Sequence, residues 1–230
     1  MELEPIAQSL SKLPEQFSCV DWPDALHDVP ESRCHWFSTR GREEFKRLLK
    51  NLPLCPLYIE FGTFLGAGST TFALESRKDL QAICLDNWEI ATIEEESKPL
   101  NYKDKDGNVC GFARGEGEAL KHCQNNLWEY RSRVHLLRTT TSHVTVDILA
   151  NAGLQPDCVF IDDDHGKEPF LKRLFRCRYR WPNSLIVCDD YCKAWPGVIE
   201  GVAEAFRRGW YREDESQMLG NRMIAFKRNR

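Results

Sequence analysis

FIDDDH (residues 160–165) is an apolar strand pattern that runs directly into clustered carboxylates, and IVCDDY (residues 186–191) repeats the pattern. Buried parallel strands are short continuous apolar runs, and open α/β sheets bind ligands beyond the carboxyl ends of their strands. Two neighbouring strands that end in aspartates bring like charges together, which a cation, a shared proton or catalytic work would compensate. The alternative is that these aspartates cap the following helices, which explains one aspartate per strand.

The region from residue 57 onward alternates short apolar runs with helical patterns. Strands are predicted at 57–61, 81–85, 133–137, 157–161 and 184–188, and helices at about 68–78, 115–130, 143–152, 167–181 and 197–208. Two further strand-like runs, 209–213 and 222–227, have no helix between them and are expected to be antiparallel. The pattern predicts an α/β fold with a Rossmann-like, doubly wound, mostly parallel seven-stranded sheet and an antiparallel C-terminal strand pair.

The segment 1–56 precedes this alternation and is too short for a second domain. It carries Trp22, Trp36 and Phe37 among many polar residues, and a helix is predicted over 41–51. We expect this helical segment to pack on or cap a core domain at 57–230, either covering the carboxyl edge of the sheet or filling its side. The long polar connection at 87–114 is typical of a functional lid or a mobile segment.

Composition limits the classes of partner. The chain has 230 residues, of which 42% are hydrophobic and 29% charged, and no run of about 18 apolar residues predicts a membrane span. A net charge of −4 gives no electrostatic footprint for nucleic acid, and the basic residues from Arg173 to Arg180 are interpreted as a solvated helix face. The ten cysteines include no Cys-x-x-Cys pair, and the chain does not begin with a secretory signal pattern. We therefore expect reduced thiols and a cytoplasmic location.

EFGTFLGAGST (residues 60–70) links the first predicted strand to its helix. Glycines let the backbone approach a ligand closely, and the amino terminus of a helix offers unpaired N–H groups. The third glycine of the dinucleotide fingerprint is missing, and Glu60 before the loop suits a cationic ligand better than a pyrophosphate. Asp86 closes the second strand, where a carboxylate can bind a ribose diol.

These segments together resemble the class I S-adenosylmethionine-dependent methyltransferases. Residues 59–63 with 69–70 resemble the first motif of that family, and residues 85–89 resemble its second motif. The acidic strand ends resemble the branch that contains metal-dependent small-molecule and sugar O-methyltransferases, and the resemblance covers about 57–227. Asp163 and Lys167 depart from the usual glycine and tyrosine, and the loop is one residue longer before Ser69. Which of the three aspartates at 162–164 faces a metal is therefore left open.

The resemblance implies a set of cofactor contacts for S-adenosylmethionine. The implied residues are Glu60, Gly62, Thr63, Gly66, Ser69, Asp86, Trp88, Ser142 and Asp162. Asp86 would bind the ribose and Trp88 would lie near the adenine. Trp88 could equally pack under the long loop, and Ser142 could cap the helix that begins near His143.

The resemblance also implies a way to activate the methyl acceptor, because a neutral hydroxyl needs a base or a metal to react at neutral pH. Asp162, Asp189 and Asp190 would hold a hard divalent cation such as Mg²⁺. Asp164 would be the base, with His165 as the alternative. His165 could equally be a helix-start residue that is hydrogen-bonded to a neighbouring carboxylate.

The expected function is O-methylation of a small-molecule or sugar hydroxyl. The alternatives are an N-methyltransferase, a metal-free methyltransferase, or a non-catalytic binding protein with the same fold. The expected partner is a small-molecule substrate and neither a nucleic acid nor a membrane, and a homo-oligomer is compatible with the sequence.

Overall fold

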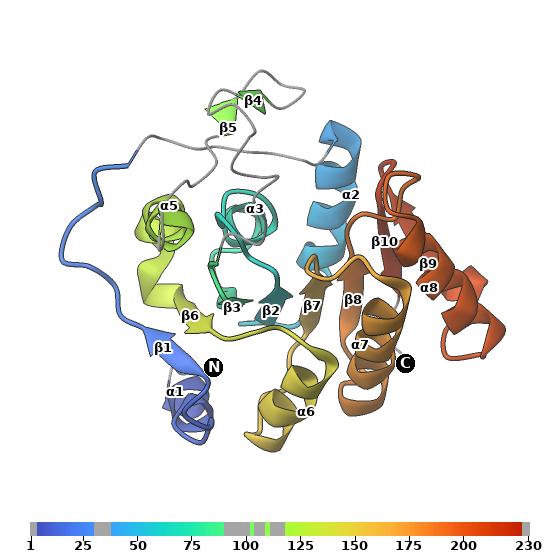
Figure 1. Cartoon of the computed structure of the whole chain (residues 1–230), viewed down its shortest axis with the longest axis horizontal. Helices are drawn as coiled ribbons and strands as arrows, with labels where there is room; N and C mark the ends of the chain where they lie inside the picture. Colours follow the sequence, from blue (N-terminus) through green and yellow to red (C-terminus); the bar gives the residue numbers. More distant parts are fainter. Residues whose placement is uncertain (1–3, 30–37, 90–101, 104–108, 111–117, 227–230) are drawn as a thin grey trace.

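The computed structural model describes residues 4–29, 38–89, 102–103, 109–110 and 118–226. A central sheet has helices on both of its faces (Figure 1). Its strand order is β1-β6-β3-β2-β7-β8-β10-β9. The chain crosses from one half of the sheet to the other after β6 (Figure 1).

The five central strands are parallel, and the strands at both edges are antiparallel to them or to each other. The parallel strands are β2 (Leu57–Phe61), β3 (Gln81–Asp86), β6 (Val134–Arg138), β7 (Cys158–Ile161) and β8 (Leu185–Cys188). β10 (Met223–Phe226) pairs antiparallel with both β8 and β9 (Ser216–Leu219). At the other edge, β1 (Ser18–Val20) pairs antiparallel with β6. The predicted fold class is confirmed, and the short β1 adds an eighth strand to the seven expected.

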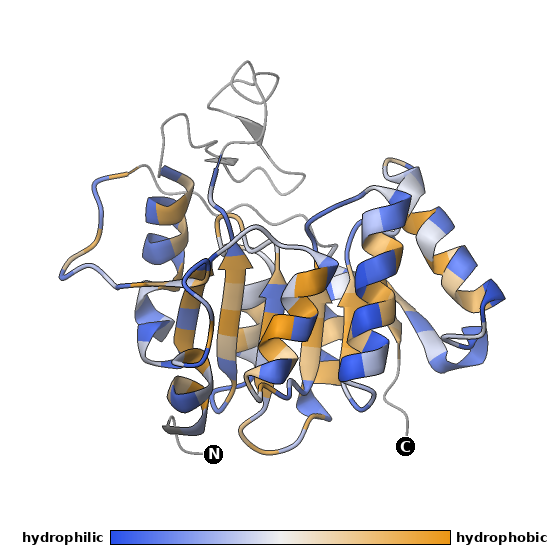
Figure 2. Ribbon diagram, turned by 60° about the horizontal axis from the view of Figure 1, so that its bottom comes forward, coloured by the Kyte–Doolittle hydropathy of each residue, from blue (hydrophilic) through white to orange (hydrophobic). Residues whose placement is uncertain are grey.

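Two cores lie on opposite faces of the sheet. Along β2, Leu57, Ile59 and Phe61 point into the first core while Tyr58 points into the second, because side chains alternate along a strand. The helices of the first face are α1 (Glu4–Leu10), α6 (His143–Asn151), α7 (Lys167–Arg180) and α8 (Pro196–Arg207). Those of the second are α2 (Thr39–Lys50), α3 (Ser69–Ser76) and α5 (Glu118–Leu127). Figure 2 shows the hydrophobic strands in the middle and hydrophilic residues on the outward faces of the helices.

The segment before β2 contributes to both cores. Ile6 and Phe17 pack in the first core, and Phe45 and Leu49 of α2 pack in the second. Ser38 caps α2 by accepting the N–H of Gly41 at 3.0 Å. The described residues of this segment therefore pack on both faces of the sheet.

The predicted strand at 209–213 is wrong. Gly209 follows α8 in a left-handed conformation with φ of 68°, which ends the helix, and β9 begins only at Ser216. Tyr211 packs on Phe226 with 4.2 Å between the ring centroids, and its hydroxyl donates to the carbonyl of Leu174 at 3.2 Å. The apolar residues that suggested a strand therefore belong to a turn held by packing.

Other predicted boundaries shift by a few residues. The helix predicted at 115–130 is described from Glu118, and it passes at Trp128 into a 3₁₀ helix (Trp128–Arg133). In the connection at 87–114 the described residues include only 87–89, β4 (Tyr102–Lys103) and β5 (Val109–Cys110). The lid expected there lies outside the described residues.

None of the described helices is long and apolar enough to cross a membrane. Eight cysteines whose side chains the structure describes form no disulfide: Cys19, Cys55, Cys84, Cys123, Cys158, Cys177, Cys188 and Cys192.

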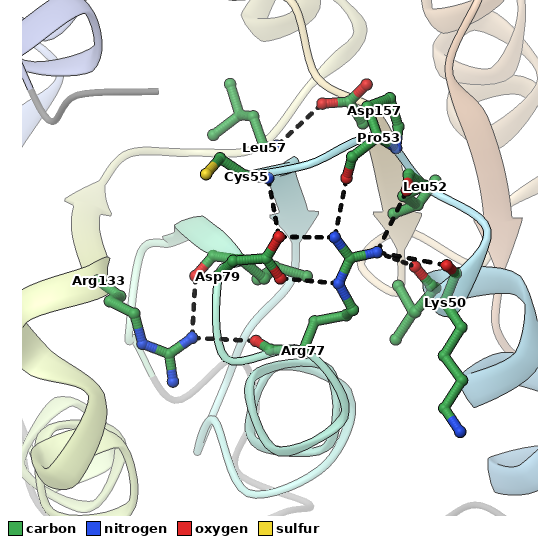
Figure 3. A network of polar contacts seen from close by, with 11 residues as sticks. Lys50, Leu52, Pro53, Cys55, Leu57, Arg77, Asp79, Arg133 and Asp157 are labelled. Carbon is green, nitrogen blue, oxygen red and sulfur yellow. Dashed lines mark hydrogen bonds and ion pairs between the residues drawn. The ribbon is translucent and has the colours of Figure 1, made fainter.

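Arg77 stabilises the end of the sheet at which the parallel strands begin (Figure 3). Its guanidinium pairs with both carboxylate oxygens of Asp79 at 2.7 and 2.8 Å and donates to the carbonyls of Leu49, Leu52 and Pro53 at 2.8–3.2 Å. The hydrogen bonds from Arg77 hold the pKa of Asp79 well below its ordinary value. This network ties the end of α2 to the turn before β3, at the edge opposite the carboxyl ends of the parallel strands.

Candidate active site

The glycine loop passes over the end of β7. Gly62 has φ of 85° and Gly66 has φ of 65°. Residues with a side chain rarely adopt such positive values of φ. A Cβ at Gly62 would lie 2.1 Å from the carbonyl oxygen of Asp162. Gly66 also closes a turn, donating its N–H to the carbonyl of Thr63 at 2.8 Å. The loop thus touches the first of the acidic strand ends.

Glu60 lies beneath the loop and is only 1% exposed. Its carboxylate accepts hydrogen bonds from the hydroxyls of Tyr58 at 2.7 Å, Ser69 at 2.5 Å, and Thr70. Burial raises the pKa of Glu60 to about 7, although the hydroxyls lower it in part. Glu60 and Ser69, both expected to contact the cofactor, therefore join β2 to the start of α3 in this structure.

Asp86 and Trp88 hold the loop from the other side. The carboxylate of Asp86 accepts the N–H of Phe64 and the N–H of Trp88, each at 2.8 Å, and burial raises the pKa of Asp86. Trp88 is 2% exposed, and its indole N–H donates to the carbonyl of Phe64 at 2.8 Å. Trp88 thus packs in the second core. Packing was the alternative to a cofactor contact for this residue.

Ser142 and Thr63 complete the expected cofactor set. Ser142 is the N-cap residue of α6, and its N–H donates to the hydroxyl of Thr145 at 3.1 Å. Thr63 is 5% exposed within the loop. Ser142 therefore has the capping role that the sequence left open beside cofactor binding.

The ends of β7 and β8 lie side by side. The N–H of Asp162 donates to the carbonyl of Phe61 at 2.9 Å, and the N–H of Asp189 donates to the carbonyl of Ile161 at 3.0 Å. Burial, followed by the charge of Asp189, raises the pKa of Asp162 well above its ordinary value. Parallel pairing thus brings the two acidic ends together, as the sequence predicted.

Asp163 points away from these ends and forms an ion pair with Arg173 of α7. The Arg173 side chain is 1% exposed and lies 5.1 Å from the centroid of the Phe61 ring. Burial lowers the pKa of Arg173 to about 10. The interpretation of Arg173 as part of a solvated face is wrong, because a helix residue that faces the sheet finds its counter-ion at the strand end.

Asp164 and His165 take different positions. Asp164 is exposed and accepts the N–H of Gly166 at 2.8 Å. Nε2 of His165 lies 2.6 Å from Oδ2 of Asp190 and 3.8 Å from Oδ1 of Asp162. Burial lowers the pKa of His165, but the neighbouring carboxylates of Asp162 and Asp190 outweigh it and raise the pKa to about 9. Of the two proposed bases, His165 is the one within the cluster.

Two residues at the start of α8, its N-cap Trp195 and Gly197 of its first turn, fix His165. The ring of Trp195 stacks on the imidazole with 4.0 Å between centroids. A Cβ at Gly197 would lie 2.3 Å from the carbonyl oxygen of His165, so only glycine permits this approach.

A third charged residue, Arg222, joins the two acidic strand ends, and no sequence motif indicated it. Its Nε lies 3.2 Å from Oδ1 of Asp189, and its Nη2 pairs with Oδ1 of Asp190. Burial raises the pKa of Asp189 to about 6, with Arg222 acting in the opposite direction. The signal that could have found Arg222 is the hairpin register: Ile224 pairs with Cys188 across β10 and β8, which sets residue 222 opposite Asp190.

Three of these side chains could hold a metal ion. Asp162, His165 and Asp190 each offer one ligand atom, and the three atoms lie within 4.8 Å of one another. Two carboxylates and an imidazole are a chemically suitable donor set for a divalent cation. The expected set had Asp189 where the structure brings His165.

No protein-family profile matches the sequence, and no curated protein matches it. Solved structures are similar in fold. A Staphylococcus aureus protein provisionally assigned as a caffeoyl-CoA O-methyltransferase has a TM-score of 0.51 and 11% identity, over 83% of this chain and 84% of that one. The O-methyltransferase NovP has a TM-score of 0.50 and 16% identity, over 83% and 80%.

A third similar structure is an S-adenosylmethionine-dependent O-methyltransferase from Thermotoga maritima. Its TM-score is 0.50 and its identity 10%, over 86% of this chain and 68% of that one. The chain has the class I methyltransferase fold, as the resemblance in sequence implied.

Proposed function

We propose that this chain is an S-adenosylmethionine-dependent methyltransferase that methylates a hydroxyl of a small molecule or sugar. The observation that carries the proposal is the contact between its two candidate sites: a Cβ at Gly62 would overlap the backbone of Asp162. A ligand on the glycine loop would therefore lie beside the acidic cluster. Ligands of open α/β sheets bind at this edge.

The loop residues would bind and orient the cofactor, which supplies an electrophilic methyl group. Each oxygen of Asp86 already accepts one backbone N–H. A carboxylate has about four acceptor sites, so Asp86 retains capacity for ribose hydroxyls. Glu60 and Trp88 would act through the loop, because both are buried against it.

Asp162, His165 and Asp190 would hold a divalent cation, for which Mg²⁺ was the expectation from sequence. Such a cation lowers the pKa of a bound hydroxyl, and the acidic surroundings favour a substrate without several negative charges. Because His165 would then be a ligand, Asp164 remains the proposed proton acceptor: its exposed carboxylate lies directly before His165 in the turn that leads to α7.

Titration calorimetry with S-adenosylhomocysteine tests the cofactor assignment. We expect binding to the wild type, and Asp86→Ala should weaken it by about 1–3 kcal/mol because partners are left unpaired. NAD should give no heat of binding. A folded wild-type protein that does not bind S-adenosylhomocysteine would refute the proposal and favour the non-catalytic binding protein.

A further inference from the structure

Arg222 is held at the acidic cluster by both its backbone and its side chain. It precedes β10 directly, and its carbonyl accepts the N–H of Tyr191 at 2.7 Å. The side chain is 23% exposed. The turn that carries Arg222 is itself held in place, because Gly220 donates its N–H to the carboxylate of Glu44 in α2 at 2.7 Å. The guanidinium is therefore a fixed part of the site.

This guanidinium removes carboxylate oxygens from the cluster. Oδ1 of Asp189 is bound to Nε of Arg222 and also accepts the N–H of Asp190 at 2.7 Å. Oδ1 of Asp190 is bound to Nη2 of Arg222, whereas Oδ2 of Asp190 lies 2.6 Å from His165. The ligand atoms that remain close together belong to Asp162, His165 and Asp190.

The composition of this set bears on which cation it prefers. Mg²⁺ favours carboxylate oxygens and retained waters. Imidazole nitrogen suits transition metals, which bind mixed nitrogen and oxygen sites more tightly along the series from Mn²⁺ to Cu²⁺. Exchanging one carboxylate for an imidazole should therefore move selectivity away from Mg²⁺.

We propose that Arg222 determines the cation specificity of the cluster. It holds Asp189 and one oxygen of Asp190, which leaves two carboxylates and one imidazole as ligands. This set of ligands selects Mn²⁺ or Co²⁺ over Mg²⁺. The inference deepens the proposed function and rests on it only in taking the cluster to be a cation site. His165 is a ligand in this scheme, and Trp195 positions it by stacking.

Calorimetric titration of the full chain with Mn²⁺ and with Mg²⁺, without cofactor, tests the proposal. The wild type should bind Mn²⁺ at least about tenfold more tightly than Mg²⁺. Arg222→Gln frees both aspartates, so this variant should bind Mg²⁺ more tightly and the ratio of Mn²⁺ to Mg²⁺ affinity should narrow. His165→Asn should also narrow this ratio, because it should bind Mn²⁺ more weakly. Arg208→Gln is the control, because Arg208 pairs with Glu204 on the surface of α8, and its ratio should equal that of the wild type.

Equal wild-type affinity for the two ions, binding of neither ion, or an unchanged ratio in Arg222→Gln would overturn the proposal. If Arg222→Gln does not fold by circular dichroism, Arg222→Lys provides the same comparison, since a single ammonium cannot hold both aspartates as a planar guanidinium does. The titration with S-adenosylhomocysteine is independent of these measurements. A chain that selects Mn²⁺ but does not bind S-adenosylhomocysteine would refute the proposed function and retain this inference.

Discussion

The buried carboxylate of Glu60 couples the stability of the fold to pH. Its folded pKa of about 7 lies above the ordinary value of 4.5, so the folded state retains a proton that the unfolded state has lost between those values. This contribution to stability is fully present below pH 4.5 and is lost as pH rises through 7. We expect it to reach about 3 kcal/mol.

Glu60→Gln should lack this pH dependence. Urea unfolding of the wild type and the variant, measured between pH 4.5 and 8, gives the difference in free energy of unfolding at each pH. That difference should change in favour of the variant as pH rises. Parallel curves for the two proteins would show that Glu60 keeps an ordinary pKa.

The ion pair of Asp163 and Arg173 should be costly to break from one side. Arg173→Met leaves a buried carboxylate without its counter-ion, which destabilises proteins by about 3–5 kcal/mol. Adding Asp163→Asn to that variant removes the stranded charge and should recover much of the loss. Chemical unfolding of the two single variants and the double variant measures this coupling, and additive losses would contradict it.

At the scale of elements, Gly62 decides whether the glycine loop can pass over the end of β7. Gly62→Ala places a methyl group against the backbone of Asp162 and forces alanine into a left-handed conformation. We expect a loss of more than about 1 kcal/mol in free energy of unfolding and weaker binding of S-adenosylhomocysteine. Gly68→Ala is the matched control, since nothing lies within 4 Å of its Cβ position, and it should be tolerated.

The central strands and their helices could be predicted because each strand is an apolar run that is buried on both faces. The pattern failed where apolar residues serve a turn, as in Tyr211, and where a strand is short and partly exposed, as in β1. The acidic strand ends could be predicted from strand direction alone. The orientation of individual aspartates could not, because Asp163 and Asp189 are oriented by arginines from other elements.

At the scale of the whole molecule, the cluster depends on segments that are distant in sequence. The hairpin of β9 and β10 brings Arg222 to the end of β8, and α2 holds that hairpin through Glu44. A Cβ at Gly220 would lie 2.4 Å from Oγ of Ser38, so the start of α2 and the hairpin turn are in direct contact. The N-terminal segment thereby helps to position Arg222, which lies near the opposite end of the chain.

Glu44→Ala tests this connection across the molecule. Removing the carboxylate leaves the N–H of Gly220 without its acceptor, and we expect a loss of about 1–3 kcal/mol in free energy of unfolding. Because the turn carries Arg222, a looser turn should also weaken its hold on Asp189 and Asp190. The ratio of Mn²⁺ to Mg²⁺ affinity should then narrow, as in Arg222→Gln, but by less.

Glu43→Ala, an exposed neighbour on α2, is the control for removal of charge from this helix. If Glu44→Ala is destabilised while its ion ratio stays at the wild-type value, then the hairpin holds Arg222 in place without help from α2.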